Sequence, residues 1–180
     1  MNISGSDFRI RTDFRDILTI LDAYNDPELN DEVKAYIMLR IMYPNLDQIP
    51  EESLQEAVDK AVEFIDCGQS DDGRKKPQLM DWEQDADILI PAINKAAGCE
   101  VRALPHLHWW TFLGYYMEIG DSLFSQVVNI RYKHAHGQKL DKWEKDFERE
   151  NRSLCVIRKR MTEEEKATRE AERKALEELI

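Results

Sequence analysis

The segment "ALPHLHWWTFLGYY" at residues 103–116 gathers two tryptophans, one phenylalanine, two tyrosines and two histidines in an otherwise polar, acidic chain. Drawn as a helix, it has two adjoining apolar faces, Leu107–Trp110–Gly114–Met117 and Trp109–Phe112–Leu113–Tyr116. An apolar arc this wide is typical of a helix that packs on two sides. We therefore expect a central helix, which is either entirely core or partly core and partly a contact surface for another protein.

Tryptophan and tyrosine are favoured anchors of protein interfaces, so the second interpretation supplies candidate binding residues. These candidates are Trp109, Trp110, Phe112, Tyr115 and Tyr116. His108 is expected to lie beside the tryptophans as a polar neighbour.

Helical spacing of apolar residues continues on the N-terminal side of this segment. Residues 12–24 carry a stripe of Phe14, Ile17, Leu18, Leu21 and Tyr24, and residues 25–44 carry Leu29, Val33, Tyr36, Ile37 and 39–41. We expect Asp26 to cap the second helix, with Pro27 at its first position, so that the two helices form an antiparallel hairpin. A third helix is expected before Gly68, which is placed as its C-terminal cap.

On the C-terminal side the spacing predicts further helices. One starts with a capping box of Asp81 and Gln84, and Pro91 predicts a kink near residues 87–90. Another is expected to be capped by Asp121, and a weaker one surrounds Trp143. The last, charged segment carries a capping box of Thr162 and Glu165.

The expected fold is all-α, a small bundle of about six to seven helices in two halves. The N-terminal half, residues 1–67, holds the hairpin and the third helix. A polar loop or hinge at 68–80 leads to the C-terminal half at 81–152, which contains the aromatic helix. The charged helix at 161–180 is expected to extend from the core, because it has few large apolar residues.

Composition excludes several classes of function. The net charge of −11 over 180 residues argues against phosphate-driven nucleic-acid binding and against docking on anionic lipid. No apolar run is long enough for a membrane span, and the first residues show no signal-peptide core. Three cysteines, Cys67, Cys99 and Cys155, are odd in number and far apart, which indicates free thiols in a reducing cytoplasm.

The four histidines form two His-x-His pairs, His106 with His108 and His134 with His136. Zinc needs several convergent ligands, whereas residues two apart on a helix point in nearly opposite directions. We therefore predict no metal site and no cofactor, and these four histidines are only the residual candidates. The alternating acids from Asp81 to Asp87 lack the glycine and glutamate of a calcium loop. No motif for nucleophilic catalysis is present, so we expect no enzymatic activity.

Three segments together resemble a known protein family. "WEQDADILIPAINKAAGCEV", "LPHLHWWTFLGYY" and "FSQVVNIRYK" are similar, in this order, to signatures of the bacteriophage gp-fifteen family, which is encoded among tail genes of long-tailed phages. The opening helical hairpin resembles that family too, so the match covers roughly residues 12–150. The final "KATREAERKALEELI" runs beyond the family pattern.

The resemblance implies a non-enzymatic tail assembly chaperone in the cytoplasm of the host cell. Its implied partners are the phage tape-measure protein, the tail-tube protein and other copies of the chain. A tape-measure helix with exposed apolar faces aggregates unless it is covered, and a small acidic helical protein can cover it and keep it soluble. Two alternatives stay open: a structural virion adaptor at the head–tail joint or tail tip, and a small metalloenzyme that uses the histidine pairs.

Overall fold

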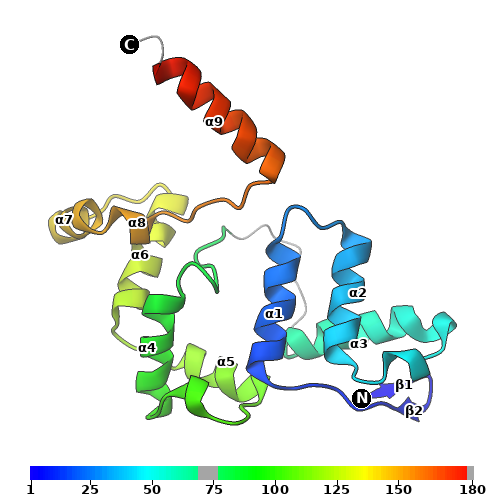
Figure 1. Cartoon of the computed structure of the whole chain (residues 1–180). Coiled ribbons are helices and arrows are strands. Elements are labelled where there is room, and N and C mark those ends of the chain that lie inside the picture. The colour runs from blue at the N-terminus through cyan, green and yellow to red at the C-terminus, as the bar shows by residue number, and fades with distance from the viewer. Residues whose placement is uncertain (69–76, 178–180) are drawn as a thin grey trace.

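The computed structural model describes residues 1–68 and 77–177, and helices dominate this part of the chain (Figure 1). The α-helices are α1 (Phe14–Asn25), α2 (Asp31–Met42), α3 (Leu54–Ile65), α4 (Ala86–Ala97), α5 (Trp109–Met117), α6 (Leu123–Ala135), α7 (Lys142–Glu150), α8 (Arg152–Cys155) and α9 (Glu163–Glu177). Short 3-10 helices occupy Leu46–Gln48, Glu51–Ser53 and Val101–Ala103. The all-α prediction is confirmed. The described residues form more helices than the six to seven expected. One reason is that Asn151 interrupts the helix and separates α7 from α8.

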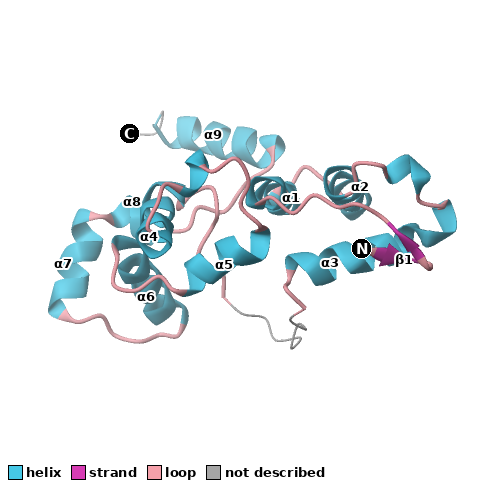
Figure 2. Cartoon of the chain, turned by 90° about the horizontal axis from the view of Figure 1, so that it is seen from below, coloured by secondary structure: helices cyan, strands magenta, loops and turns pink. Residues whose placement is uncertain are grey.

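The helices form a connected series of packed pairs. Figure 1 shows α1 and α2 side by side, with α3 running across their lower ends. Helix α5 lies between α1 and α4 and contacts both, and α4 continues the packing to α6 (Figure 2). Helix α9 projects from the rest of the molecule, and each of its side chains that the structure describes is exposed (Figure 1).

One hydrophobic core extends through both predicted halves. The buried cluster includes Phe14 and Phe64 from the N-terminal half and Leu89, Ile93 and Phe112 from the C-terminal half. The predicted hinge at 68–80 falls mainly on residues 69–76, which lie outside the described residues. The hinge therefore stays a prediction.

The hairpin of α1 and α2 forms, but its turn differs from the prediction. Asp26 ends α1, and its carboxylate accepts a hydrogen bond from the backbone N–H of Glu28. Asn30 caps α2 instead, and its side chain accepts from the N–H of Val33 at 2.9 Å. The predicted cap at Asp26 is wrong, because the N–H of Leu29 donates to the carbonyl of Asp26 and closes a turn, and α2 begins only after Asn30.

The buried face of α2 also differs from the predicted stripe. Met38, Leu39 and Met42 are buried, whereas Val33 and Tyr36 are exposed. Only the second half of α2 meets the core, because α3 crosses the hairpin at that end (Figure 1). The sequence spacing could not distinguish the two faces, since apolar residues surround this helix on several sides.

The other helix starts show how short polar side chains compete for the capping position. Ser122, not Asp121, caps α6 and forms a capping box with Ser125. The Asp81 carboxylate accepts a hydrogen bond from the N–H of Gln84, as predicted. The N–H of Asp81, however, donates to the carboxylate of Asp85 and not to the side chain of Gln84, and α4 begins only at Ala86. The predicted box between residues 162 and 165 at the start of α9 is present.

A small hairpin of β1 (Asn2–Ile3) and β2 (Ser6–Asp7) precedes the helices. Ser4 and Gly5 have φ angles of 48° and 82°, and successive positive φ values are typical of a tight hairpin turn. The Ser4 hydroxyl donates to Glu56 of α3 at 2.7 Å, which fastens the turn to the helix. Strands of two residues are too short to alternate visibly, so the sequence did not reveal them.

None of the helices in the described ranges is long and apolar enough to cross a membrane.

Candidate functional site

The aromatic segment forms α5, and its start is bound to the start of α1. The His108 ring caps α5, with Nδ1 accepting from the N–H of Trp110 at 3.2 Å. The N–H of Trp109 donates to the carbonyl of Thr12 at 2.7 Å. The N–H of Phe14 donates to the carbonyl of Leu107 at 3.0 Å. This short antiparallel bridge fixes the direction in which both helices leave the junction.

Asp13 reinforces the same junction from the side of α1. Its carboxylate accepts hydrogen bonds from the N–H groups of Arg15 and Leu107, at 3.0 and 2.9 Å. Partial burial acts to raise the pKa of Asp13, but these backbone bonds and the Arg15 guanidinium, 2.9 Å from both carboxylate oxygens, together outweigh it, so the pKa lies below the usual value of 3.8. Asp13 is therefore a helix cap and a cross-link in its ionised form.

Both tryptophans of α5 reach the end of α3. The indole N–H of Trp109 donates to the carbonyl of Ile65, and that of Trp110 donates to the carbonyl of Phe64, each at 2.8 Å. The last four carbonyls of a helix have no acceptor role within that helix. The tryptophan pair therefore caps α3 from a distant part of the chain and joins the two predicted halves.

The two tryptophans differ in burial. Trp109 is 2% exposed and stacks on Phe112, which is fully buried and stacks in turn on Phe14 at 4.4 Å between ring centroids. Trp110 is 50% exposed and stacks on Phe64 at 5.3 Å. Trp109 and Phe112 are therefore core residues, whereas Trp110 presents aromatic surface.

The two tyrosines of the candidate set lie between these extremes. Tyr115 and Tyr116 are half-buried and pack against the main core. The ring of Tyr116 contacts those of Trp82 and Phe124, and burial raises its pKa. Of the five predicted binding residues, Trp110 has the largest exposed fraction.

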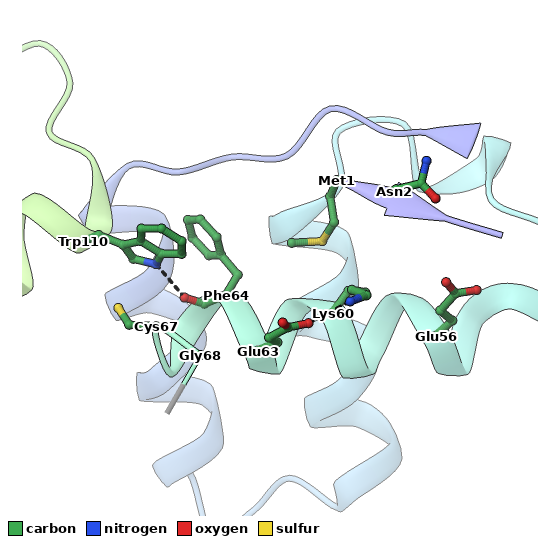
Figure 3. A pocket seen from close by; sticks show the side chains of 9 residues that line it. All are labelled: Met1, Asn2, Glu56, Lys60, Glu63, Phe64, Cys67, Gly68 and Trp110. Atoms are coloured by element: carbon green, nitrogen blue, oxygen red, sulfur yellow. Dashed lines mark hydrogen bonds and ion pairs between the residues drawn. The ribbon is translucent and has the colours of Figure 1, made fainter. Parts of the chain in front are cut away.

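Trp110 borders an open groove with a volume of about 470 Å³ along α3 (Figure 3). The groove is lined by Met1, Asn2, Glu56, Lys60, Glu63, Phe64, Cys67, Gly68 and Trp110. Figure 3 shows the Trp110 and Phe64 rings at one end, Met1 near the middle, and Asn2 with Glu56 at the other end. We call this the Trp110 groove.

The Trp110 groove combines an apolar end with charged walls. Lys60 is paired with Glu63 at 2.8 Å, while Glu56 accepts two hydrogen bonds from Ser4. The hydroxyl and N–H bonds from Ser4 lower the pKa of Glu56, which keeps this carboxylate ionised. The lining residues thus carry the carboxylates of Glu56 and Glu63 together with two ammonium groups, that of Lys60 and the N-terminal group of Met1, which donates to the carbonyl of Phe8.

The thiol of Cys67, which lies beside Trp110 in the groove lining (Figure 3), is not activated for chemistry. Burial, with a smaller contribution from Asp66, raises its pKa, so the thiol stays protonated near neutral pH. A half-exposed indole at an apolar end, with the carboxylates of Glu56 and Glu63 further along, can hold an apolar side chain that has basic neighbours. It provides no nucleophile–base pair.

Of the groove residues, Trp110 was predicted from the sequence as a binding residue, whereas the others were not. Glu56, Lys60 and Phe64 follow the four-residue spacing of one helix face, a signal that was available in the sequence. The placement of Met1 across this face depends on the β1–β2 hairpin, which had no visible signal.

The structure gives each of the four histidines a separate local partner. The His106 ring contacts the Thr12 hydroxyl, and His108 caps α5. The His134 ring pairs with Glu148, and the His136 ring contacts the carbonyl of residue 132. Within residues 1–68 and 77–177, no group of three or more histidine, cysteine, aspartate or glutamate side chains could hold a metal ion.

Among the alternating acids near the start of α4, Asp85 forms a buried ion pair. Asp85 is 1% exposed and forms a two-point ion pair with Arg131 of α6, at 2.6 and 2.8 Å. Arg131 also donates to the carbonyls of Leu79 and Leu154. This buried pair links α4, α6 and α8, so Asp85 has a structural role.

Comparison with known proteins identifies one family model. The model described as "Bacteriophage Gp15 protein" matches residues 1–157, which is most of the chain and includes the Trp110 groove. No curated protein and no solved structure matches the chain.

Proposed function

Because the chain belongs to the bacteriophage Gp15 protein family, we propose that it is a non-enzymatic tail assembly chaperone that binds the tape-measure protein. The observation that carries this proposal is the half-exposed Trp110 at the head of the groove. A large aromatic ring held on a rigid helix and partly open to solvent is the common form of an interface anchor.

The contacts around Trp110 support a role as a preorganised anchor. Its indole N–H is already satisfied by the carbonyl of Phe64, so a partner does not have to provide a polar group. Stacking on the Phe64 ring fixes the orientation of the indole. Little side-chain freedom is therefore lost when a partner docks, and this favours binding.

The size of the groove limits what it can hold. A volume of about 470 Å³ accommodates one or two large side chains, not a whole helix. We propose that it takes apolar residues of one helical turn of the tape-measure protein, with lysine or arginine neighbours facing Glu56 and Glu63. Several copies of the chain along one tape measure then cover its apolar length, in the host cytoplasm, and help to recruit tail-tube subunits.

Co-expression with the tape-measure protein of the same phage tests the proposal. The wild-type chain should increase the soluble fraction of the tape measure and co-purify with it, whereas Trp110→Ala should lose most of both effects. Trp143→Ala is a matched control, because Trp143 is 55% exposed and stacks on Phe147 at 5.4 Å, away from the groove lining. Equal loss of solubility in both variants, or no effect of the wild-type chain, contradicts the proposal.

Mass spectrometry of purified virions separates this function from that of a virion adaptor. A chaperone leaves the particle, so its peptides should be absent from mature virions while tail-tube peptides are abundant. Stoichiometric amounts of the chain in virions would instead identify a structural component.

A further inference from the structure

A short extended segment, residues 156–161, crosses from α8 to α1 and leads into α9 (Figure 1). We call it the strap. The side-chain amide of Gln84 holds its backbone at two points: Nε2 donates to the carbonyl of Val156 at 2.8 Å, and Oε1 accepts from the N–H of Arg158 at 2.9 Å. This pairing uses only the backbone of the strap, in the way that a neighbouring β-strand holds an extended peptide.

Arg160 supplies the side-chain part of the contact. Its guanidinium lies 2.7 Å from the carboxylate of Asp22, 2.8 Å from that of Glu83 and 3.7 Å from that of Asp81. The Arg160 side chain is 27% exposed and that of Asp81 is 9% exposed, so this contact is partly shielded from water. A single arginine thus neutralises part of a cluster of three carboxylates from two distant parts of the chain.

The space beside the strap is open. A cleft of about 380 Å³ is bordered by Asp81, Glu83 and Gln84 on one side and by residues 158–160 on the other. A second cleft, of about 410 Å³, lies beside it and is bordered by residues 26–28. The strap therefore lies in a larger acidic depression that it does not fill.

The strap is held by polar contacts that are weak individually. Val156, Arg158 and Lys159 are exposed, and the described residues of the strap contribute none to the buried core. Ion pairs at partly exposed positions contribute about 0–1 kcal/mol each and are screened by salt. Exchange of the strap for another segment of the same chemistry is therefore energetically accessible.

We propose that Asp22, Asp81, Glu83 and Gln84 form a docking surface for an extended, arginine-bearing segment of a partner protein, and that the strap occupies this surface in the isolated chain. The family model matches residues 1–157, so all four docking residues lie within it, while Arg158 and Arg160 lie just beyond it. The docking surface shares no residue with the Trp110 groove, and the proposal does not depend on the chaperone function. The strap acts as an internal competitor, and its displacement frees α9 to move.

The probe is a fluorescent peptide with the sequence of residues 156–161, VIRKRM, and the measurement is its anisotropy with the full chain. A vacated variant combines Arg158→Pro, which removes the N–H that Gln84 accepts, with Arg160→Ala. This variant should bind the peptide at least about tenfold more tightly than the wild-type chain, a difference of about 1.4 kcal/mol. Adding Asp22→Asn and Glu83→Gln to the vacated variant should abolish the gain.

Two controls define the chemistry. A peptide with alanine at the position of Arg160 should not bind. The Lys159→Ala chain should behave as wild type, because the Lys159 side chain is 82% exposed and its ammonium pairs with Glu165, which is not a docking residue. Equal affinity of the wild-type and vacated chains, or no binding to either, overturns the proposal. Self-association of the vacated variant in sedimentation, without peptide binding, also overturns it and identifies a second copy as the occupant.

Hydrogen exchange on the wild-type chain gives a test that does not depend on the stability of a variant. A saturating excess of the peptide should displace the strap and speed hydrogen exchange at residues 156–165. Salt at about 0.5 M, which screens the ion pairs of Arg160, should produce the same change without peptide. Unchanged exchange at these residues in the presence of the peptide contradicts the proposed competition.

Discussion

Trp109 and Trp110 are adjacent in sequence, and their indole N–H groups bind adjacent carbonyls, those of Ile65 and Phe64. Yet Trp109 is 2% exposed and Trp110 is 50% exposed. Because consecutive helical residues point about 100° apart, one indole enters the core while the other covers the last turn of α3. The pair thus joins α5 to α3 and also leaves an aromatic surface on the outside.

This division of roles predicts different costs for the same substitution at the two positions. Trp109→Phe leaves the carbonyl of Ile65 without its indole donor and opens space in the core, so it should destabilise the fold by about 2–4 kcal/mol. Trp110→Phe should cost about 1 kcal/mol or less, since water can reach that site. Urea unfolding followed by circular dichroism measures both values. Equal losses would contradict the assignment of Trp109 to the core.

The buried pair of Asp85 and Arg131 predicts a large loss of stability on removal of the cation. Arg131→Met leaves the Asp85 carboxylate buried without its counter-charge and should cost about 3–5 kcal/mol in the free energy of unfolding. Arg102→Met is the control, because Arg102 pairs with Glu100 on the surface, and its unfolding midpoint should stay near that of the wild-type chain. A small effect at Arg131 would indicate that water reaches the pair.

The start of α6 provides a test of capping at one-residue resolution. Ser122→Ala removes the side chain that accepts from the N–H of Ser125 and should cost about 1 kcal/mol. Asp121→Ala changes the residue that the sequence pattern favoured, and the stability of the chain should change little. Thermal unfolding of the two variants measures the difference, and the opposite order would place the cap at Asp121.

Asp13 predicts a specific dependence of stability on pH. Its pKa is lower in the folded chain than the usual 3.8, so its contribution is present above that value and is lost as the pH falls through the folded-state pKa. Between about pH 6 and about pH 3, the free energy of unfolding should therefore fall less in Asp13→Asn than in the wild-type chain. Identical pH profiles would show that the carboxylate does not act as a cross-link between α1 and Leu107.

The sequence predicted those features that depend on local spacing. The periodic apolar residues of α1, α3, α4 and α5 predicted helices at these positions. The predicted C-terminal cap at Gly68 is displaced by two residues: Asp66 caps α3, Cys67 takes a positive φ of 54°, and the N–H of Gly68 donates to the carbonyl of Glu63. The three sequence segments that resemble the bacteriophage gp-fifteen family also predicted the family whose model matches residues 1–157. Such features need only neighbouring residues, because helical periodicity and capping act over a few positions.

The capping residue of α6 and the buried face of α2 were predicted wrongly, because in each case the sequence offers several candidates. Asp121 and Ser122 are both good capping residues, and the difference depends on which one has extended backbone when α6 packs. In α2, apolar residues occur on several sides, and the positions of α1 and α3 together select Met38 and Met42 for burial. Local patterns give the type of an element more reliably than its end or its orientation.

Only the tertiary structure decided what the distant residues do together. The sequence alone established an acidic, all-α chain with an aromatic central helix, since composition and periodicity are properties of the chain itself. The Trp110 groove joins Met1, α3 and α5, and the strap joins Arg160 to Asp22 across 138 positions of the chain. Such contacts arise from how the helices pack, which depends on the summed burial of many side chains and is not encoded in the spacing of any one segment.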